Sequence, residues 1–305
     1  LDRLMSQVVA DLCDYSRKHS SSRVSATVVD LGYVDEPLVQ PVFGSWRGDA
    51  RVYPASVVKV FYMAAAYVWQ RQGRLTITPS VYRDLKFMIG PSSNVATQDV
   101  LNLICGVRSG SALSASEFRE FSRKRNVVNE WLYSLGLTNT NANQATWDDE
   151  YSPRDRQLVT GNLSGEGPHV NQNISTSNDI AKFFLLIAQN RLGSAEDCDA
   201  MRTLMARDTK DRQRSGYRRI FQDALPAGTI LWGKSGFTSE TSHDAGIITS
   251  PSGRRFILVV MAEVNWDNTS FLGKFATETM KKLEDMDVRG DRLSSTISAD
   301  SSDFN

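Results

Sequence analysis

Short apolar runs typical of β-strands occur at both ends of this chain, and a long stretch with helical periodicity separates them. Near the start, RVSATVVDLG and EPLVQPVFG read as two strands joined by a turn. Near the end, GTILWGKSG, SHDAGIITS and RRFILVVMAEV are runs of the same kind. Because a sheet must bury an apolar face, we expect strands from both ends to form one antiparallel sheet.

Helical periodicity predicts the remaining elements. An amphipathic first helix is predicted for LDRLMSQVVADLCDYSRKH, and a last helix for SFLGKFATETMKKLEDM. Helices between them are expected at residues 56–75, 94–104, 116–136 and 178–192. The predicted fold class is therefore α/β (α+β), an antiparallel sheet flanked by N- and C-terminal helices with an inserted all-helical domain.

The predicted domain division follows this pattern. Residues 1–50 and 213–286 form an α/β domain built from both termini, and residues 51–212 form the inserted helical domain. Within the insertion, residues 138–176 are rich in Asn, Gly, Ser and acids, which predicts a long active-site loop. Residues 287–305 have no apolar period and are expected to be a disordered tail. We expect a small-molecule site in the cleft between the two parts.

Composition argues against several classes of function. Lys and Arg number 35, as do Asp and Glu, so the chain has no electrostatic reason to seek nucleic acid or an anionic membrane. The three cysteines and three histidines show no metal-ligand spacing, so neither a metal nor a cofactor is expected. The longest apolar run, Val60 to Trp69, is far shorter than the ~20 residues of a membrane helix, so no membrane segment is expected. A small neutral or zwitterionic substrate fits best.

A lysine follows a serine by three residues at the head of the apolar segment SVVKVFYMAAAY. If a helix begins here, the side chains of Ser56 and Lys59 share one face and can hydrogen-bond. Taken alone, Ser56 reads as an N-cap residue and Lys59 as a solvated charge. The apolar neighbours of Lys59 instead favour a neutral amine, which beside a hydroxyl is a general base. A serine at a helix N-terminus also lies among backbone N–H groups suited to a developing oxyanion.

Two further patterns follow in the order that completes a serine hydrolase site, Ser92-Ser93-Asn94 and Lys234-Ser235-Gly236. S-x-x-K together with S-x-N and K-T/S-G is described for class A β-lactamases and penicillin-binding proteins. The chain resembles this penicillin-recognising serine hydrolase family, and most of all its class A branch, from about Arg23 to Asp285. The resemblance implies a β-lactamase/transpeptidase-like fold and a hydrolase that forms an acyl-enzyme with a β-lactam or peptide-like amide.

The resemblance also implies a role for each residue of the first two motifs. Ser56 attacks the carbonyl and is acylated, while Lys59 takes its proton directly or through water. Ser92 relays that proton to the leaving nitrogen, and Asn94 hydrogen-bonds the side-chain amide of the substrate.

On the predicted strand, the resemblance implies that Lys234 supplies positive charge and Ser235 holds the substrate carboxylate. Gly236 lets the substrate lie against the strand edge without a Cβ in the way. The oxyanion hole is formed by the backbone N–H groups of Ser56 and Phe237. Taken alone, the same triplet is also compatible with an ordinary exposed edge strand.

The loop that supplies the deacylating acid in class A enzymes departs from the family pattern. TWDDEYSPRD is similar to the family's W-E-P-E-L-N, with Asp148 at the place of the catalytic glutamate and Ser152 at the last position. Aspartate is shorter by one methylene, about 1.5 Å, which matters for placing the attacking water. Glu150 and Glu166 are the other candidates, and all three acids also fit solvated loop charges.

Two other positions depart from the family. Ser93 stands where the lactamases typically have an aspartate, and Ala245 lies near the place of an arginine on the strand after K-T-G. His243, Arg218 and Arg219 are alternatives for binding a carboxylate, and none of them is preferred.

Several functions remain open at this point. A D,D-peptidase or penicillin-binding protein keeps the three motifs but lacks the deacylating acid. A sensor uses the acylated state as its signal, and a glutaminase-like hydrolase acts on another amide or ester. Family analogy favours export to the periplasm or the cell exterior, although the chain shows no leader.

Overall fold

The sheet is the centre of the fold. The computed structural model describes residues 1–13, 20–35, 40–146, 151–209, 220–263 and 270–288. Its six strands are all antiparallel, in the order β2-β1-β6-β5-β4-β3. They are β1 (Val24–Tyr33), β2 (Val42–Trp46), β3 (Ala206–Arg207), β4 (Ile230–Phe237), β5 (Ser242–Thr249) and β6 (Arg254–Ala262). Strands from the two ends of the chain therefore lie side by side, as the sequence predicts.

The central strands are apolar on both faces, because helices cover the sheet on both sides. In β6, Ile257, Val259 and Met261 enter one core, while Leu258 and Val260 enter the other. The alternation follows from the two-residue period of a strand, and the apolar run in β6 is explained by burial on both sides.

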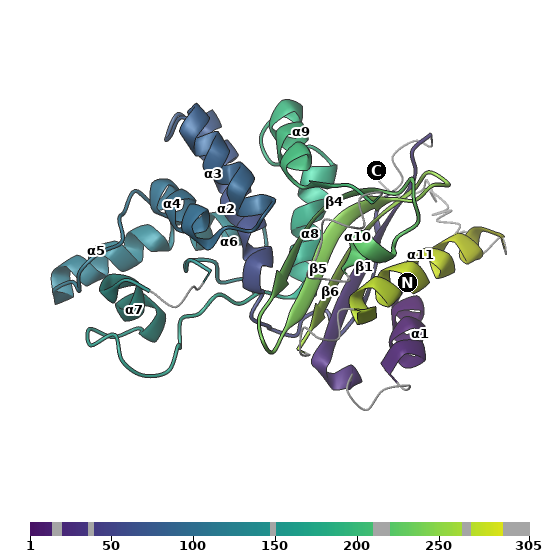
Figure 1. Cartoon of the computed structure of the whole chain (residues 1–305), viewed down its shortest axis with the longest axis horizontal. Helices are drawn as coiled ribbons and strands as arrows, with labels where there is room; N and C mark the ends of the chain where they lie inside the picture. Colours follow the sequence, from purple (N-terminus) through teal and green to yellow (C-terminus); the bar gives the residue numbers. More distant parts are fainter. Residues whose placement is uncertain (14–19, 36–39, 147–150, 210–219, 264–269, 289–305) are drawn as a thin grey trace, which may run out of the picture.

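Two groups of helices cover these faces (Figure 1). One face carries α1 (Asp2–Cys13), α10 (Phe221–Ala224) and α11 (Ser270–Val288), which share a core with it. The other face packs against α8 (Ser177–Ala188) and the helical part of the chain. That part contains α2 (Lys59–Arg71), α3 (Pro79–Ile89), α4 (Asn94–Cys105), α5 (Ala115–Arg125), α6 (Val127–Ser134), α7 (Pro153–Thr160) and α9 (Ala195–Leu204). Two 3-10 turns, η1 (Ser21–Arg23) and η2 (Ala55–Val58), complete the described elements.

The predicted fold class is confirmed, but some details of the helices differ from the prediction. The helix expected at residues 116–136 is two helices, α5 and α6, which meet at Asn126. The expected loop at residues 138–176 contains α7. Its start signals are present in the sequence, since Ser152 is the N-cap and Pro153 occupies the first turn. Helices α3 and α9 begin in the same way, after Thr78 and Ser194.

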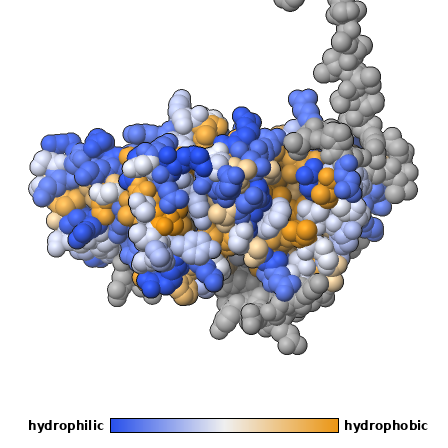
Figure 2. All heavy atoms as spheres, turned by 90° about the horizontal axis from the view of Figure 1, so that it is seen from above, coloured by the Kyte–Doolittle hydropathy of each residue, from blue (hydrophilic) through white to orange (hydrophobic). Residues whose placement is uncertain are grey.

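Other parts of the prediction are not tested. The domain division at residues 50 and 212 stays a prediction. The disordered tail is expected at residues 287–305. Its first two residues belong to α11, so the prediction is wrong there, and residues 289–305 lie outside the described residues. No helix among the described residues is long and apolar enough to cross a membrane. On the face seen in Figure 2, apolar residues gather in separate patches between hydrophilic ones.

Candidate active site

Ser56 lies in a strained turn rather than in an α-helix. The chain forms the 3-10 turn η2 and enters α2 only at Lys59, so the prediction of a helix starting at Ser56 is wrong by one turn. Ala55, directly before the serine, has φ of 46°, a conformation that residues with a side chain rarely adopt. The Val57 amide donates to Pro54 O at 3.1 Å and closes the turn. Strained backbone of this kind is frequent at functional sites.

Lys59 is completely buried and contacts the second motif. Its Nζ donates to Ser92 O at 2.7 Å, to Ser92 Oγ at 3.1 Å and to Asn94 Oδ1 at 2.8 Å. The reading of Lys59 as a solvated charge is therefore wrong. These three contacts hold the lysine against the S-x-N loop and satisfy a buried amine that would otherwise be costly.

The third motif reaches the same hydroxyl. Lys234, on β4, is 2% exposed, and its Nζ donates to Ser92 Oγ at 2.9 Å and to Ser235 O at 2.9 Å. Ser92 itself has φ of 63°, a second strained residue within the site. The hydroxyl of Ser92 thus lies between two lysine amines, one from α2 and one from β4. All three motifs meet at this point.

Asn94 is oriented by two donors. Its Oδ1 accepts from Lys59 Nζ and from Thr146 Oγ1 at 2.8 Å, which turns the amide nitrogen to the opposite side. Thr146 was not foreseen, because nothing in its local sequence marks it as part of the site. Ser93, at the middle of the motif, is the N-cap of α4 and accepts from the Ala96 amide at 3.2 Å.

Gly236 lets β4 approach the Ser56 turn. A Cβ added at this position would lie 2.8 Å from each of three backbone atoms, Pro54 O, Ser56 N and Val57 N. Any side chain here would therefore push the strand and the turn apart. The flanking residues, Ser235 and Phe237, are partly exposed beside the turn.

His243 does not face a substrate carboxylate, which corrects one of the alternatives drawn from the sequence. The residue is buried, and its Nε2 contacts Tyr53 O at 2.9 Å while Nδ1 accepts from the Ala262 amide at 3.1 Å. Burial lowers the pKa of His243 to about 4, although hydrogen bonds with the backbone of Tyr53 and Ser242 oppose the shift. The imidazole is therefore neutral at pH 7.

This burial predicts a pH-dependent stability. The unfolded chain binds the proton near the usual pKa of 6.5 and the folded chain near 4, so folding loses stability as pH falls through this window. We expect the wild type to lose up to about 1.4 kcal/mol per pH unit relative to a His243→Gln variant, whose side chain does not titrate. Urea unfolding of both proteins from pH 7 to pH 4 measures the difference. A constant difference would contradict the buried neutral imidazole.

Arg207, on the strand that pairs with the K-S-G strand, already has a carboxylate partner. Arg207 on β3 donates to both carboxylate oxygens of Asp244, at 2.9 and 2.8 Å, and to Gly233 O at 3.2 Å. Ala245, near the family's arginine position, is buried opposite Lys234. Arg218 and Arg219 lie outside the described residues.

The candidate deacylating acids Asp148 and Glu150 also lie outside the described residues. The chain on either side of them is described. Tyr151 OH donates to Ala145 O at 3.3 Å, which brings the two flanks together. Glu166 is exposed beyond α7.

A buried ion pair anchors the helix that follows these acids. Arg125 Nη2 lies 2.6 Å from Asp155 Oδ1, and Ser152 Oγ donates to Asp155 Oδ2 at 2.5 Å. Both side chains of the pair are almost completely buried. The start of α7 is therefore fixed against the end of α5.

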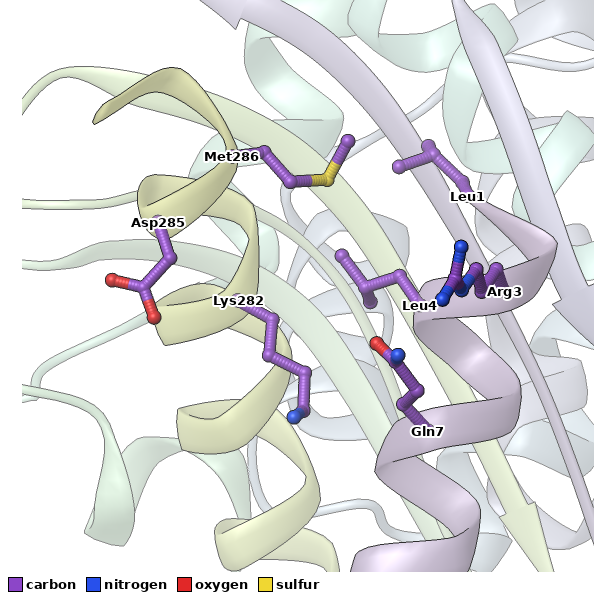
Figure 3. A pocket seen from close by; sticks show the side chains of 7 residues that line it. All are labelled: Leu1, Arg3, Leu4, Gln7, Lys282, Asp285 and Met286. Carbon is purple, nitrogen blue, oxygen red and sulfur yellow. The ribbon is translucent and has the colours of Figure 1, made fainter. Parts of the chain in front are cut away.

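A pocket of about 400 Å³ lies elsewhere, between α1 and α11 (Figure 3). It is lined by Leu1, Arg3, Leu4, Gln7, Lys282, Asp285 and Met286. Because α1 and α11 cover the face of the sheet opposite to the helical part, this pocket is separate from Ser56 (Figure 1). Within the described ranges, no group of three or more His, Cys, Asp or Glu residues could hold a metal ion.

Comparison with known families gives the same assignment as the motifs. A family model described as "Beta-lactamase enzyme family" matches residues 17–283. The chain belongs to the beta-lactamase enzyme family. The resemblance to penicillin-recognising serine hydrolases is thereby confirmed, and the family supports a serine hydrolase of the kind that cleaves amides. No curated protein matches the sequence of this beta-lactamase family member.

Solved structures confirm the fold of this beta-lactamase family member. A class A β-lactamase from Bacteroides cellulosilyticus has a TM-score of 0.64 at 15% identity, over 93% of this chain and 98% of that one. A β-lactamase from Sphaerobacter thermophilus has a TM-score of 0.62 at 18% identity, over 92% and 96%. A mutant of PBP-A, solved as its acyl-enzyme complex with penicillin G, has a TM-score of 0.61 at 16% identity, over 93% and 97%.

Proposed function

We propose that this protein is a serine hydrolase that forms an acyl-enzyme on Ser56 with a β-lactam or a related amide. One observation carries the proposal: Ser92 Oγ accepts hydrogen bonds from both Lys59 Nζ and Lys234 Nζ. A proton can therefore pass through Ser92 between Lys59, the first residue of α2, and Lys234 on the K-S-G strand without leaving the site.

The proposed acylation step uses these contacts for the transfer of protons. Ser56 Oγ attacks the substrate carbonyl, and its proton goes directly or through a water to Lys59 Nζ, which is neutral for this step and then donates at most two of its three hydrogen bonds. The backbone N–H groups of Ser56 and Phe237 stabilise the resulting oxyanion. When the C–N bond breaks, the leaving nitrogen takes a proton from Ser92 Oγ, which is replenished from one of its two lysine donors.

Substrate recognition is assigned to the polar groups around this path. Asn94 Oδ1 accepts from two donors, which leaves the amide nitrogen on the other side, and this supports a role for that nitrogen in binding the side chain of the substrate. Ser235 and the positive charge of Lys234 hold a substrate carboxylate. The family's typical export supports a periplasmic or extracellular location, where such substrates occur.

Deacylation requires a base for the attacking water, and Asp148 and Glu150 are the candidates. If Asp148 is the base, we expect Asp148→Asn to slow deacylation at least 10-fold, and if Glu150 is the base, we expect the same of Glu150→Gln. The reason is that a positioned base contributes about 10²–10⁴-fold. Acylation should be unchanged. Stopped-flow turnover and quenched mass measurements with penicillin G give the two rate constants separately.

Glu130→Gln, an exposed change on α6, is the matched control for this prediction. If both acid variants deacylate at the rate of the control, neither acid is the base. Slow deacylation in the wild type itself would favour the second candidate.

That second candidate is a D,D-peptidase or sensor, in which the β-lactam adduct persists. The observation that favours it is the shared fold with PBP-A, whose mutant was captured as an acyl-enzyme with penicillin G. The two candidates use the same acylation step and differ only in how long the adduct survives.

A further inference from the structure

His243 occupies a position that connects the sheet to the Ser56 turn. In the β4–β5 pairing it stands directly opposite Gly236. Side chains of directly opposed residues lie on the same face of an antiparallel sheet. Gly236 has no side chain and lies against the backbone of the turn, whereas the imidazole beside it extends to Tyr53 O, 2.9 Å from Nε2.

The partners of the imidazole determine its tautomer. Nδ1 accepts from the Ala262 amide, which can only donate, so Nδ1 carries no proton. The proton of the neutral ring is therefore on Nε2 and is donated to Tyr53 O, which can only accept. His243, on β5, is thus bound to the neighbouring strand β6 through Nδ1, and it holds the chain before Ser56 through Nε2.

The segment that His243 holds is short and strained. Val52 is bound to Ser175 by two backbone hydrogen bonds of 2.9 Å, and Tyr53 is bound to His243. The strained Ala55 then follows, with Ser56 next to it. Pro54 has no N–H to donate. Tyr53 O is therefore the last backbone group fixed by a hydrogen bond before the turn, which is closed by the Val57 amide donating to Pro54 O. A strained conformation persists only where its surroundings determine it.

We propose that His243 is a positioning residue, which holds the Ser56 turn against β4 so that the Ser56 and Phe237 amides face one site. The proposal rests on the acyl-enzyme function for its kinetic consequence, but its structural consequence stands alone. Without the contact to Tyr53, the turn can relax away from Gly236, and the distance between the two amides is no longer fixed. A small displacement of this kind is enough to impair catalysis.

Two variants separate the contact to Tyr53 from the contact to Ala262. His243→Asn retains an acceptor near the position of Nδ1, but its side chain is too short to reach Tyr53 O. His243→Gln is one methylene longer and can donate to Tyr53 O. Val259→Ala on β6 is the control for stability, because it removes buried methyl groups from the same core and leaves the hydrogen bond between His243 and Tyr53 O in place.

The test measures acylation by penicillin G and hydrogen exchange of the segment 52–58 in the folded proteins. For His243→Asn we expect the acylation rate constant to fall 10- to 100-fold, with the dissociation constant of the non-covalent complex within 3-fold of wild type. Exchange in 52–58 should be at least 10-fold faster. His243→Gln should restore both quantities to within 3-fold, and Val259→Ala should change neither.

Each outcome bears on one claim. Wild-type exchange and wild-type acylation in His243→Asn would overturn the positioning role, as would equal changes in the Val259→Ala control. Faster exchange in His243→Asn, together with no acylation of the wild type by penicillin G, would support the structural clamp and overturn the proposed function instead.

Discussion

Ser56→Ala is expected to abolish both hydrolysis and the covalent adduct with penicillin G. Lys59 and Lys234 converge on Ser92 Oγ, and the backbone of the turn that carries Ser56 lies against Gly236 on β4. The loss should be complete within detection, because the acyl-enzyme route requires a nucleophile. Intact-protein mass spectrometry measures the adduct directly, and peptide mapping of the wild type identifies the acylated residue.

Ser116→Ala, an exposed serine on α5, is the matched control and should be acylated like the wild type. The Ser56→Ala protein should fold normally, since its mutation removes one partly exposed hydroxyl. Undiminished labelling of folded Ser56→Ala, or an adduct mapped to another serine, would refute the assignment of the nucleophile.

Lys59→Met is expected to slow acylation by about 10²–10⁴, the usual contribution of a positioned proton acceptor. Methionine fills a similar volume in the buried site, but Ser92 and Asn94 lose the donor that joins them. The rate constant of adduct formation with penicillin G, measured by quenched mass spectrometry, gives the effect. Some adduct should still form, because Ser56 and the oxyanion hole remain.

The control for this variant is Lys182→Met, an exposed lysine on α8. Circular dichroism and the unfolding temperature of both variants establish that the site is still folded. An acylation rate equal to that of Lys182→Met would mean that Lys59 is only a structural cation.

The sequence allows the strands and the three motifs to be identified, but it does not indicate which atoms of the motifs are in contact. Alternation and apolar runs identified five of the six described strands, β2 with shifted bounds, because a sheet buried on both faces leaves a strong local signal. The two-residue strand β3 was not predicted, since it is too short to carry such a signal. The three motifs could be found by spacing alone, and the structure brings Lys59, Ser92 and Lys234 together. The hydrogen bonds seen for Lys59 Nζ go to Ser92 and Asn94, 33 and 35 residues away, which no spacing within a helix indicates.

The features of the site that could not be predicted depend on contacts between residues far apart in the sequence. Thr146 joins the site only because the chain returns beside Asn94, 52 residues away. His243 is one of three alternatives, none preferred, that the sequence offers for binding a carboxylate in place of the family's arginine. The strand instead turns its ring into the core toward Tyr53, 190 residues away. A 3-10 turn at Ser56 stands in place of the expected first turn of helix, and Gly236, 180 residues away, lies against it, a contact that local sequence does not indicate.

The mass of the intact protein, followed over time after mixing with penicillin G, tests the central claim most directly. The account predicts an increase equal to the mass of penicillin G, located on Ser56, which then clears as the penicillin is consumed. An adduct that persists would still support Ser56 as the nucleophile, and it would assign the protein to the peptidase or sensor class. No adduct at any time, in protein whose fold is intact, would contradict the account.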